Sequence, residues 1–234
     1  MEGIPDDVDI EMVVWDMDGT LGQGGFAHGG STRGYDRDAK SPREKYGAGK
    51  LCRFWIKGDH SMDQLDTEYL AKLPSIAAYA RQDFFDLDGF KFIVECLIGR
   101  GIKVGIASMG SYCIIKSIMN GVFGLEDNPF DETNIISGSQ SPLLVEAYQQ
   151  PEFKEMLRQH PGDKSVQKVN MIKYMATKLG VPLSRVMFFD DTPTLVRGAH
   201  DAGINAYLIS RPGFTMDYWR SVVTDNDMLK QCSQ

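Results

Sequence analysis

The chain has 234 residues, of which 42% are hydrophobic, and this is typical of a globular protein with one sizeable core. Its 25 Lys and Arg against 32 Asp and Glu leave a formal net charge of −7, which argues against a nucleic-acid partner. No apolar run is long enough to span a membrane, so we expect no membrane partner.

The N-terminus is acidic and lacks the basic and apolar regions of a signal peptide. The cysteines are scattered and form no Cys-x-x-Cys pair, so we interpret them as reduced thiols of a cytoplasmic protein. They are Cys52, Cys96, Cys113 and Cys232.

The first predicted strand, residues 12–15, runs directly into two carboxylates, Asp16 and Asp18, which are followed by Gly19. Like charges this close repel each other unless a cation lies between them. Oxygen ligands suit Mg²⁺, so the pattern indicates a magnesium site at the end of the strand. The alternative is a solvated turn, which Asp-Gly often marks.

Residues 22–50 alternate glycine with charged residues and carry no hydrophobic period, which predicts a long surface loop. A phosphate-binding glycine loop is disfavoured, because no helix start follows the glycines at the required spacing. Residues 62–80 have helical spacing, which we expect Pro74 to break into two pieces. We therefore interpret residues 1–234 as a single domain in which residues 22–86 form an insertion, either a flap or a small cap.

The rest of the chain alternates predicted helices with predicted strands. The helices are expected at residues 88–99, 113–119, 142–158, 166–179 and 193–202. The strands are expected at residues 102–107, 134–137, 185–189 and 206–209. This alternation predicts an α/β fold, a doubly wound parallel sheet covered by helices on both faces.

Polar groups follow three of the predicted strands, at the edge where such sheets bind ligands. Asp16 and Asp18 follow the first, Ser108 follows the second, and Asp190 and Asp191 follow the fourth. The Ser108 turn leads at once into a helix, whose N-terminal amides suit an anion.

Two lysines precede the fourth strand, Lys164 and Lys168, four residues apart. We expect Lys164 to lie in a solvated loop and Lys168 to lie in the helix, where its ammonium can reach the strand ends. The sequence alone leaves both open as the cation of this site.

These motifs resemble the haloacid dehalogenase superfamily. The stretch 16–20 is similar to its first motif, Ser108 to its second, Lys168 or Lys164 to its third, and the stretch 188–191 to its fourth. The resemblance covers about residues 11–21 and 88–210. It implies a Rossmann-like core of that superfamily, and the paired aspartates resemble its magnesium-dependent phosphatase subgroup. The long separation of the first two motifs leaves room for a small cap.

The resemblance implies a Mg²⁺-dependent phosphomonoester hydrolase that acts through an aspartyl-phosphate. Asp16 would be the nucleophile and Asp18 the general acid and base. Ser108, Met109 and Lys168 would bind the phosphate of a phosphorylated small molecule or a phosphoprotein. The implied metal residues are Asp16, Asp18, Asp191 and Asp190. A phosphotransferase or phosphomutase with the same intermediate remains an alternative, as does a non-catalytic binding protein on this fold.

Overall fold

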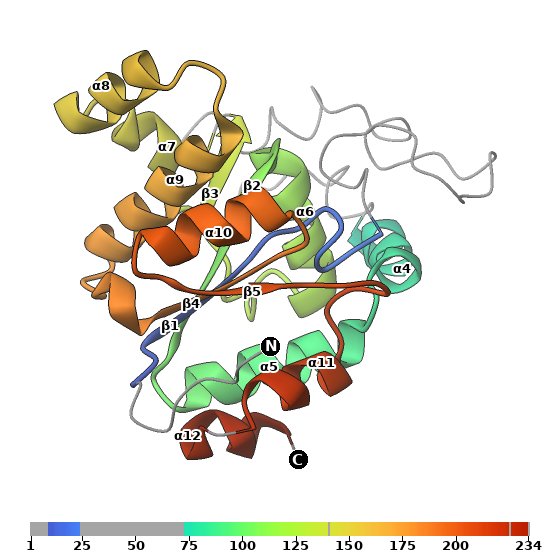
Figure 1. Ribbon diagram of the computed structural model, residues 1–234. Coiled ribbons are helices and arrows are strands. Elements are labelled where there is room, and N and C mark those ends of the chain that lie inside the picture. Colours follow the sequence, from blue (N-terminus) through green and yellow to red (C-terminus); the bar gives the residue numbers. More distant parts are fainter. Residues whose placement is uncertain (1–8, 24–72, 140, 225, 234) are drawn as a thin grey trace.

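The computed structural model describes residues 9–23, 73–139, 141–224 and 226–233. In this part of the chain five strands form one parallel sheet in the order β3-β2-β1-β4-β5 (Figure 1). The strands are β1 (Met12–Trp15), β2 (Lys103–Ser111), β3 (Ile135–Ser139), β4 (Val186–Asp190) and β5 (Asn205–Leu208). The predicted α/β fold, a doubly wound parallel sheet, is confirmed.

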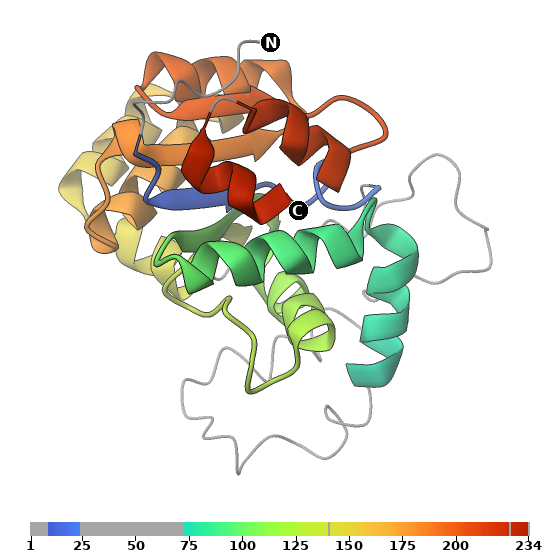
Figure 2. The same cartoon turned by 90° about the horizontal axis from the view of Figure 1, so that it is seen from below.

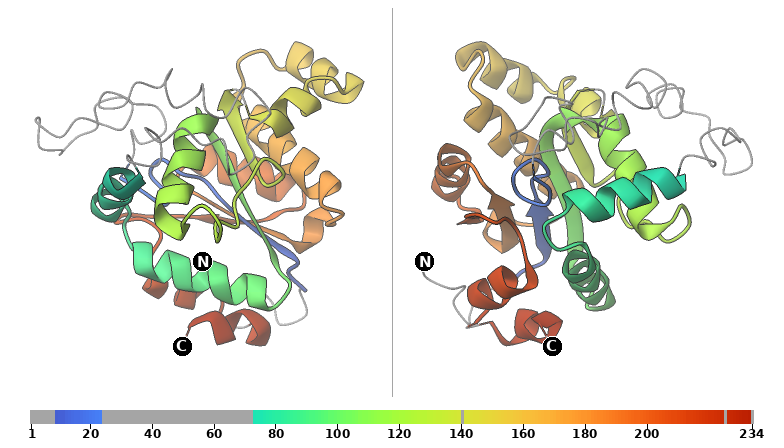
Figure 3. Two further views of the ribbon diagram at one scale, coloured as in Figure 1. Left: turned by 180° about the vertical axis from the view of Figure 1, so that it is seen from behind. Right: turned by 90° about the vertical axis from the view of Figure 1, so that its right-hand side faces the viewer.

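Helices cover both faces of this sheet (Figure 3). They are α4 (Leu73–Asp83), α5 (Leu87–Gly99), α6 (Tyr112–Phe123), α7 (Pro142–Ala147), α8 (Pro151–Gln159), α9 (Lys164–Lys178), α10 (Pro193–Asp201), α11 (Met216–Val222) and α12 (Asp227–Lys230). One face packs against α5, α6 and α11, and the other against α7, α9 and α10.

The apolar residues of β1 are divided between these two layers. Val13 and Trp15 belong to the core on the α5 side, whereas Met12 and Val14 belong to the core on the α9 side. Successive side chains of a strand point to opposite faces, so a strand covered on both faces must be apolar throughout. All four residues are buried, and β1 lies at the centre of the sheet.

Several predicted boundaries are wrong, and proline explains one of them. Pro74 lies in the first turn of α4, where proline is tolerated because an amide there has no helical partner. Residues 62–72 lie outside the described residues, so the predicted break at Pro74 stays a prediction. The helix expected at 142–158 is two helices, and Pro151 begins the second. Lys164 is the first residue of α9, so its predicted place in a loop is also wrong.

The interpretation of the cysteines as reduced is wrong as well. Cys96 in α5 and Cys232 near the C-terminus form a disulfide with a Cα–Cα distance of 5.5 Å. Helices α11 and α12 lie beside α5, which brings the two cysteines together (Figure 2). No cysteine that the structure describes is a free thiol, and Cys52 lies outside the described residues. A disulfide is uncommon in the reducing cytosol, so it argues against the cytoplasmic prediction.

Backbone hydrogen bonds join the described residues that precede residue 24 to those that follow residue 72. Gln23 donates its amide to the Asp83 carbonyl at 3.1 Å, and Phe85 donates to the Leu21 carbonyl at 3.0 Å. The root of the predicted insertion therefore lies directly after the Asp16 turn. Most of the predicted insertion, including its glycine-rich loop, lies outside the described residues, so the flap or cap and the domain boundaries stay predictions.

Among the helices that the structure describes, none combines the length and apolar character needed to span a membrane.

Candidate active site

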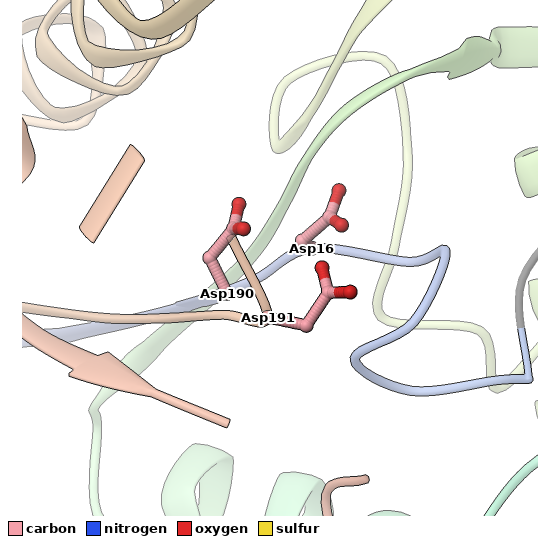
Figure 4. Close-up of side chains that lie close together, drawn as sticks. All are labelled: Asp16, Asp190 and Asp191. Carbon is pink, nitrogen blue, oxygen red and sulfur yellow. The ribbon is translucent and has the colours of Figure 1, made fainter. Parts of the chain in front are cut away.

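Three carboxyl groups meet at the carboxyl edge of the sheet. Asp16 follows β1 and Asp190 ends β4, and these strands are paired neighbours, with the Asp16 amide donating to the Phe189 carbonyl at 2.9 Å. Asp191 is the next residue after β4. Each of the three aspartates offers an oxygen within 4.8 Å of those of the other two, and their carboxyl groups extend into the same space (Figure 4). The predicted convergence of the first and fourth strand ends is thus observed.

Lys168 is the cation at this edge of the sheet. Its Nζ lies 2.6 Å from Asp16 Oδ1 and 2.6 Å from Asp190 Oδ2, and its side chain is only 2% exposed. Burial by itself would lower the pKa of Lys168, but the two carboxylates outweigh it and hold the pKa above its ordinary value. Lys168 is therefore charged and bound between two acids, whereas Lys164 lies one helical turn away at the exposed start of α9.

The surroundings of Asp16 work against its negative charge. Burial raises its pKa to about 7, and the charge of Asp190 adds to this, while Lys168 opposes it. Asp190 is fully buried, and its two oxygens are engaged: Oδ2 accepts from Lys168, and Oδ1 accepts from the Thr192 amide at 2.8 Å. Asp190 is thus bonded in a way that orients Lys168 toward Asp16.

Gly19 allows Asp191 to approach the turn after β1. A Cβ at Gly19 would lie 2.2 Å from Asp191 Oδ2, and the φ of +85° is one that only glycine adopts readily. The turn is closed by the Gly19 amide, which donates to the Gly22 carbonyl at 2.8 Å. Burial and the charge of Asp190 raise the pKa of Asp191, and the charge of Lys168 opposes them only in part. The Asp18 side chain faces the same cavity as Asp16 and Asp191.

Ser108 and Met109 reach the site from β2, but not at the start of a helix as the sequence indicated. The strand continues to Ser111, with an irregular register between Ser108 and Ser111, and α6 begins only at Tyr112. The Gly110 amide donates to Ser108 Oγ at 3.1 Å. Ser108 and Met109 nonetheless line the same cavity as the aspartates.

A hard divalent cation fits this set of donors. Lys168 is the only cation in contact with the three clustered aspartates among the residues that the structure describes. Lys168 and the Thr192 amide occupy both oxygens of Asp190, and Lys168 contacts one oxygen of Asp16, so the second oxygen of Asp16 and the carboxylate of Asp191 are the ones left to bind a metal. Oxygen donors of this kind are the ligands that Mg²⁺ prefers.

The cavity extends further than the sequence motifs indicated. It has a volume of about 920 Å³ and reaches from Asp16 to the first turns of α9 and α10, where Thr194 and Arg197 line it. Neither residue was singled out in the sequence. An isolated arginine on a predicted amphipathic helix carries no signal, because helix surfaces commonly carry charges.

No protein-family model matches the chain, and no curated protein matches it. Several solved structures do. CbbY from Rhodobacter sphaeroides in complex with phosphate is 20% identical, covering 88% of this chain and 87% of that one at a TM-score of 0.42. A HAD-superfamily hydrolase from Ehrlichia chaffeensis is 15% identical (84% and 85% covered, TM-score 0.43). β-Phosphoglucomutase from Clostridium difficile is 15% identical (95% and 92% covered, TM-score 0.42). At these identities and TM-scores none of them decides the function of this chain.

Proposed function

We propose that the protein belongs to the haloacid dehalogenase superfamily and is a Mg²⁺-dependent phosphomonoester hydrolase that acts through an aspartyl-phosphate. The observation that carries the proposal is the buried contact of 2.6 Å between Asp16 and Lys168 in a cavity that Asp18, Ser108 and Asp191 also line. A carboxylate beside a fixed cation is suited to attack a phosphate dianion, because the cation offsets the repulsion between the two anions.

In the proposed reaction an Asp16 carboxylate oxygen attacks phosphorus, and the bond from phosphorus to the leaving oxygen breaks. Asp18 donates its proton to that oxygen, so the product leaves as a neutral alcohol. Water then attacks the phosphorus of the aspartyl-phosphate while Asp18 accepts a proton from it. The bond from Asp16 to phosphorus breaks, which releases inorganic phosphate and restores both carboxyl groups.

The remaining residues neutralise and orient the phosphoryl group. Lys168 balances the charge of its oxygens, and the Ser108 hydroxyl and the Met109 amide donate hydrogen bonds to them. Asp190 orients Lys168. Mg²⁺ bound by Asp16, Asp191 and the backbone carbonyl of Asp18 would supply further neutralisation of the charge on the phosphate. The raised pKa of Asp16 supports this arrangement, since cations are needed to keep a buried nucleophile ionised.

The substrate is a phosphorylated small molecule or a phosphoprotein. The net charge of −7 supports the exclusion of nucleic acid as a partner, because no excess of basic residues is available to bind its backbone. A phosphotransferase or phosphomutase would use the same Asp16 chemistry with an alcohol in place of water. The products distinguish them, since hydrolysis releases one inorganic phosphate for each ester consumed.

The decisive experiment is the release of phosphate from an aryl phosphate by the wild-type protein and by Asp16→Asn. We expect the variant to lose turnover by several orders of magnitude while retaining its circular dichroism spectrum, because the attacking oxygen alone is removed. Asp127→Asn, an exposed aspartate outside the cavity, is the matched control and should retain turnover. Chelation should also stop the wild-type reaction, and Mg²⁺ should restore it better than Ca²⁺. Full activity of Asp16→Asn would refute the proposal.

A further inference from the structure

The cavity beyond the phosphate site has a cationic wall. Lys164, the first residue of α9, and Arg197, in the middle of α10, line the same cavity as Asp16 and Lys168. Both are exposed, and neither makes an ion pair or a side-chain hydrogen bond with another residue that the structure describes. Their charges are therefore available to a ligand, whereas the charge of Lys168 is bound by two carboxylates.

A close contact between the two helices fixes the positions of these cations. Ser165, which follows Lys164, donates its hydroxyl to the Thr194 carbonyl at 3.1 Å. Gly198, which follows Arg197, packs so tightly that a Cβ there would lie 2.6 Å from Ser165 Oγ. Lys164 precedes Ser165 and Arg197 precedes Gly198, so this helix contact holds the backbones of the two cations close together.

Two acidic residues also line this end of the cavity, and the charge of one of them is compensated. Asp163 caps α9, and its Oδ1 accepts from the amides of Ser165 and Val166 at 2.9 and 3.1 Å. A carboxylate at a helix N-terminus is compensated by the helix dipole. Asp201 is the last residue of α10, where the helix dipole disfavours a negative charge, and it makes no ion pair with another residue that the structure describes.

We propose that the substrate is a phosphomonoester with a second anionic group, a carboxylate or another phosphate, which Lys164 and Arg197 bind. This inference rests on the proposed hydrolase activity and adds the substrate class. Four residues of an α-helix rise about 6 Å, so the second anion would lie roughly that far from the phosphate beside Lys168. A chain of about four carbons joins two anionic groups over this distance.

The test compares the hydrolysis of three esters that differ only in the group at the far end. They are butyl phosphate, 4-phosphooxybutanoate and butane-1,4-diyl bisphosphate. We expect the wild-type protein to prefer the two esters that carry a second anionic group over butyl phosphate in kcat/KM by about tenfold, mainly through a lower KM, since two exposed ion pairs contribute about that much. Comparison of 4-phosphooxybutanoate with butane-1,4-diyl bisphosphate shows whether Lys164 and Arg197 recognise a carboxylate or a phosphate better.

The double variant Lys164→Gln with Arg197→Gln should lose this preference, so that the three esters become equal within about twofold. The matched control is Lys154→Gln, an exposed lysine of α8 outside the cavity, which should retain the wild-type preference. Each protein serves as its own reference, because the preference is a ratio between substrates. Thermal unfolding checks that the double variant is folded.

The outcomes separate the two proposals. Hydrolysis of all three esters at equal kcat/KM by the wild-type protein would leave the hydrolase activity standing and overturn the second anionic subsite. A preference that survives in the double variant would also overturn it. If no ester is hydrolysed, the proposed function fails first, and the subsite inference falls with it.

Discussion

Asp83 is a buried acid whose ionisation should destabilise the folded protein. It is the last residue of α4 and is 1% exposed, and neither carboxyl oxygen has a hydrogen-bond partner among the residues that the structure describes. Burial, together with the charge of Asp18, raises its pKa to about 8 against the opposing Gln23 amide. We predict that Asp83→Asn stabilises the protein far more at pH 8 than at pH 5.

The magnitude follows from the difference between the folded and unfolded states. The ordinary pKa of Asp is 3.8, so between about pH 4 and pH 8 the folded protein keeps a proton at Asp83 that the unfolded chain has lost. Stability then falls as the pH rises, by about 1.4 kcal/mol per pH unit and by at most about 6 kcal/mol over the whole interval. Asparagine has nearly the same shape as aspartic acid and does not ionise, so Asp83→Asn removes this pH-dependent loss of stability.

Urea denaturation from pH 5 to pH 8 measures the effect, because the difference in unfolding free energy between the variant and the wild type isolates Asp83. This difference should be about 1–2 kcal/mol at pH 5 and should grow by about 1.4 kcal/mol per pH unit up to about pH 8. Asp127→Asn replaces an exposed aspartate and should show a flat difference. Parallel stability curves for the wild type and Asp83→Asn would refute the reasoning.

Three further results are expected. Gly19→Ala should reduce kcat/KM for an aryl phosphate by at least about tenfold, because its Cβ would displace Asp191. It should also lower the urea midpoint, because alanine is strained at a positive φ. Unchanged kinetics would contradict the role of this turn. Lys168→Met should lower the free energy of unfolding by about 3–5 kcal/mol at pH 8, since it leaves two buried carboxylates without their cation, and by less at pH 5, which is below the raised pKa of Asp16; a pH-independent loss would count against this. Cys96→Ser, which removes the Cys96–Cys232 bond, should lower the free energy of unfolding in urea by up to about 5 kcal/mol, because the bond joins residues 136 apart in sequence; an unchanged free energy of unfolding would contradict this.

The sheet and its acidic edge could be predicted because their signals are local. An apolar run such as residues 12–15 has few alternatives to a buried strand, and its abrupt end at Asp16 marks the carboxyl edge. Parallel strands bring such ends to one edge, so the meeting of Asp16 with Asp190 and Asp191 followed from chain order alone. The limits of helices were less certain, because proline both begins and breaks helices, as Pro74 and Pro151 show.

Tertiary structure decided what depends on residues far apart in sequence. The spacing of Lys164 and Lys168 did not select between them, whereas the packing of α9 on the sheet buries Lys168 between two acids and leaves Lys164 in the open cavity. The bond between Cys96 and Cys232 depends on how α5 meets the C-terminal segment, which no local pattern encodes. Local sequence determines which residues form a strand or a helix, but the distances between side chains depend on how those elements pack together.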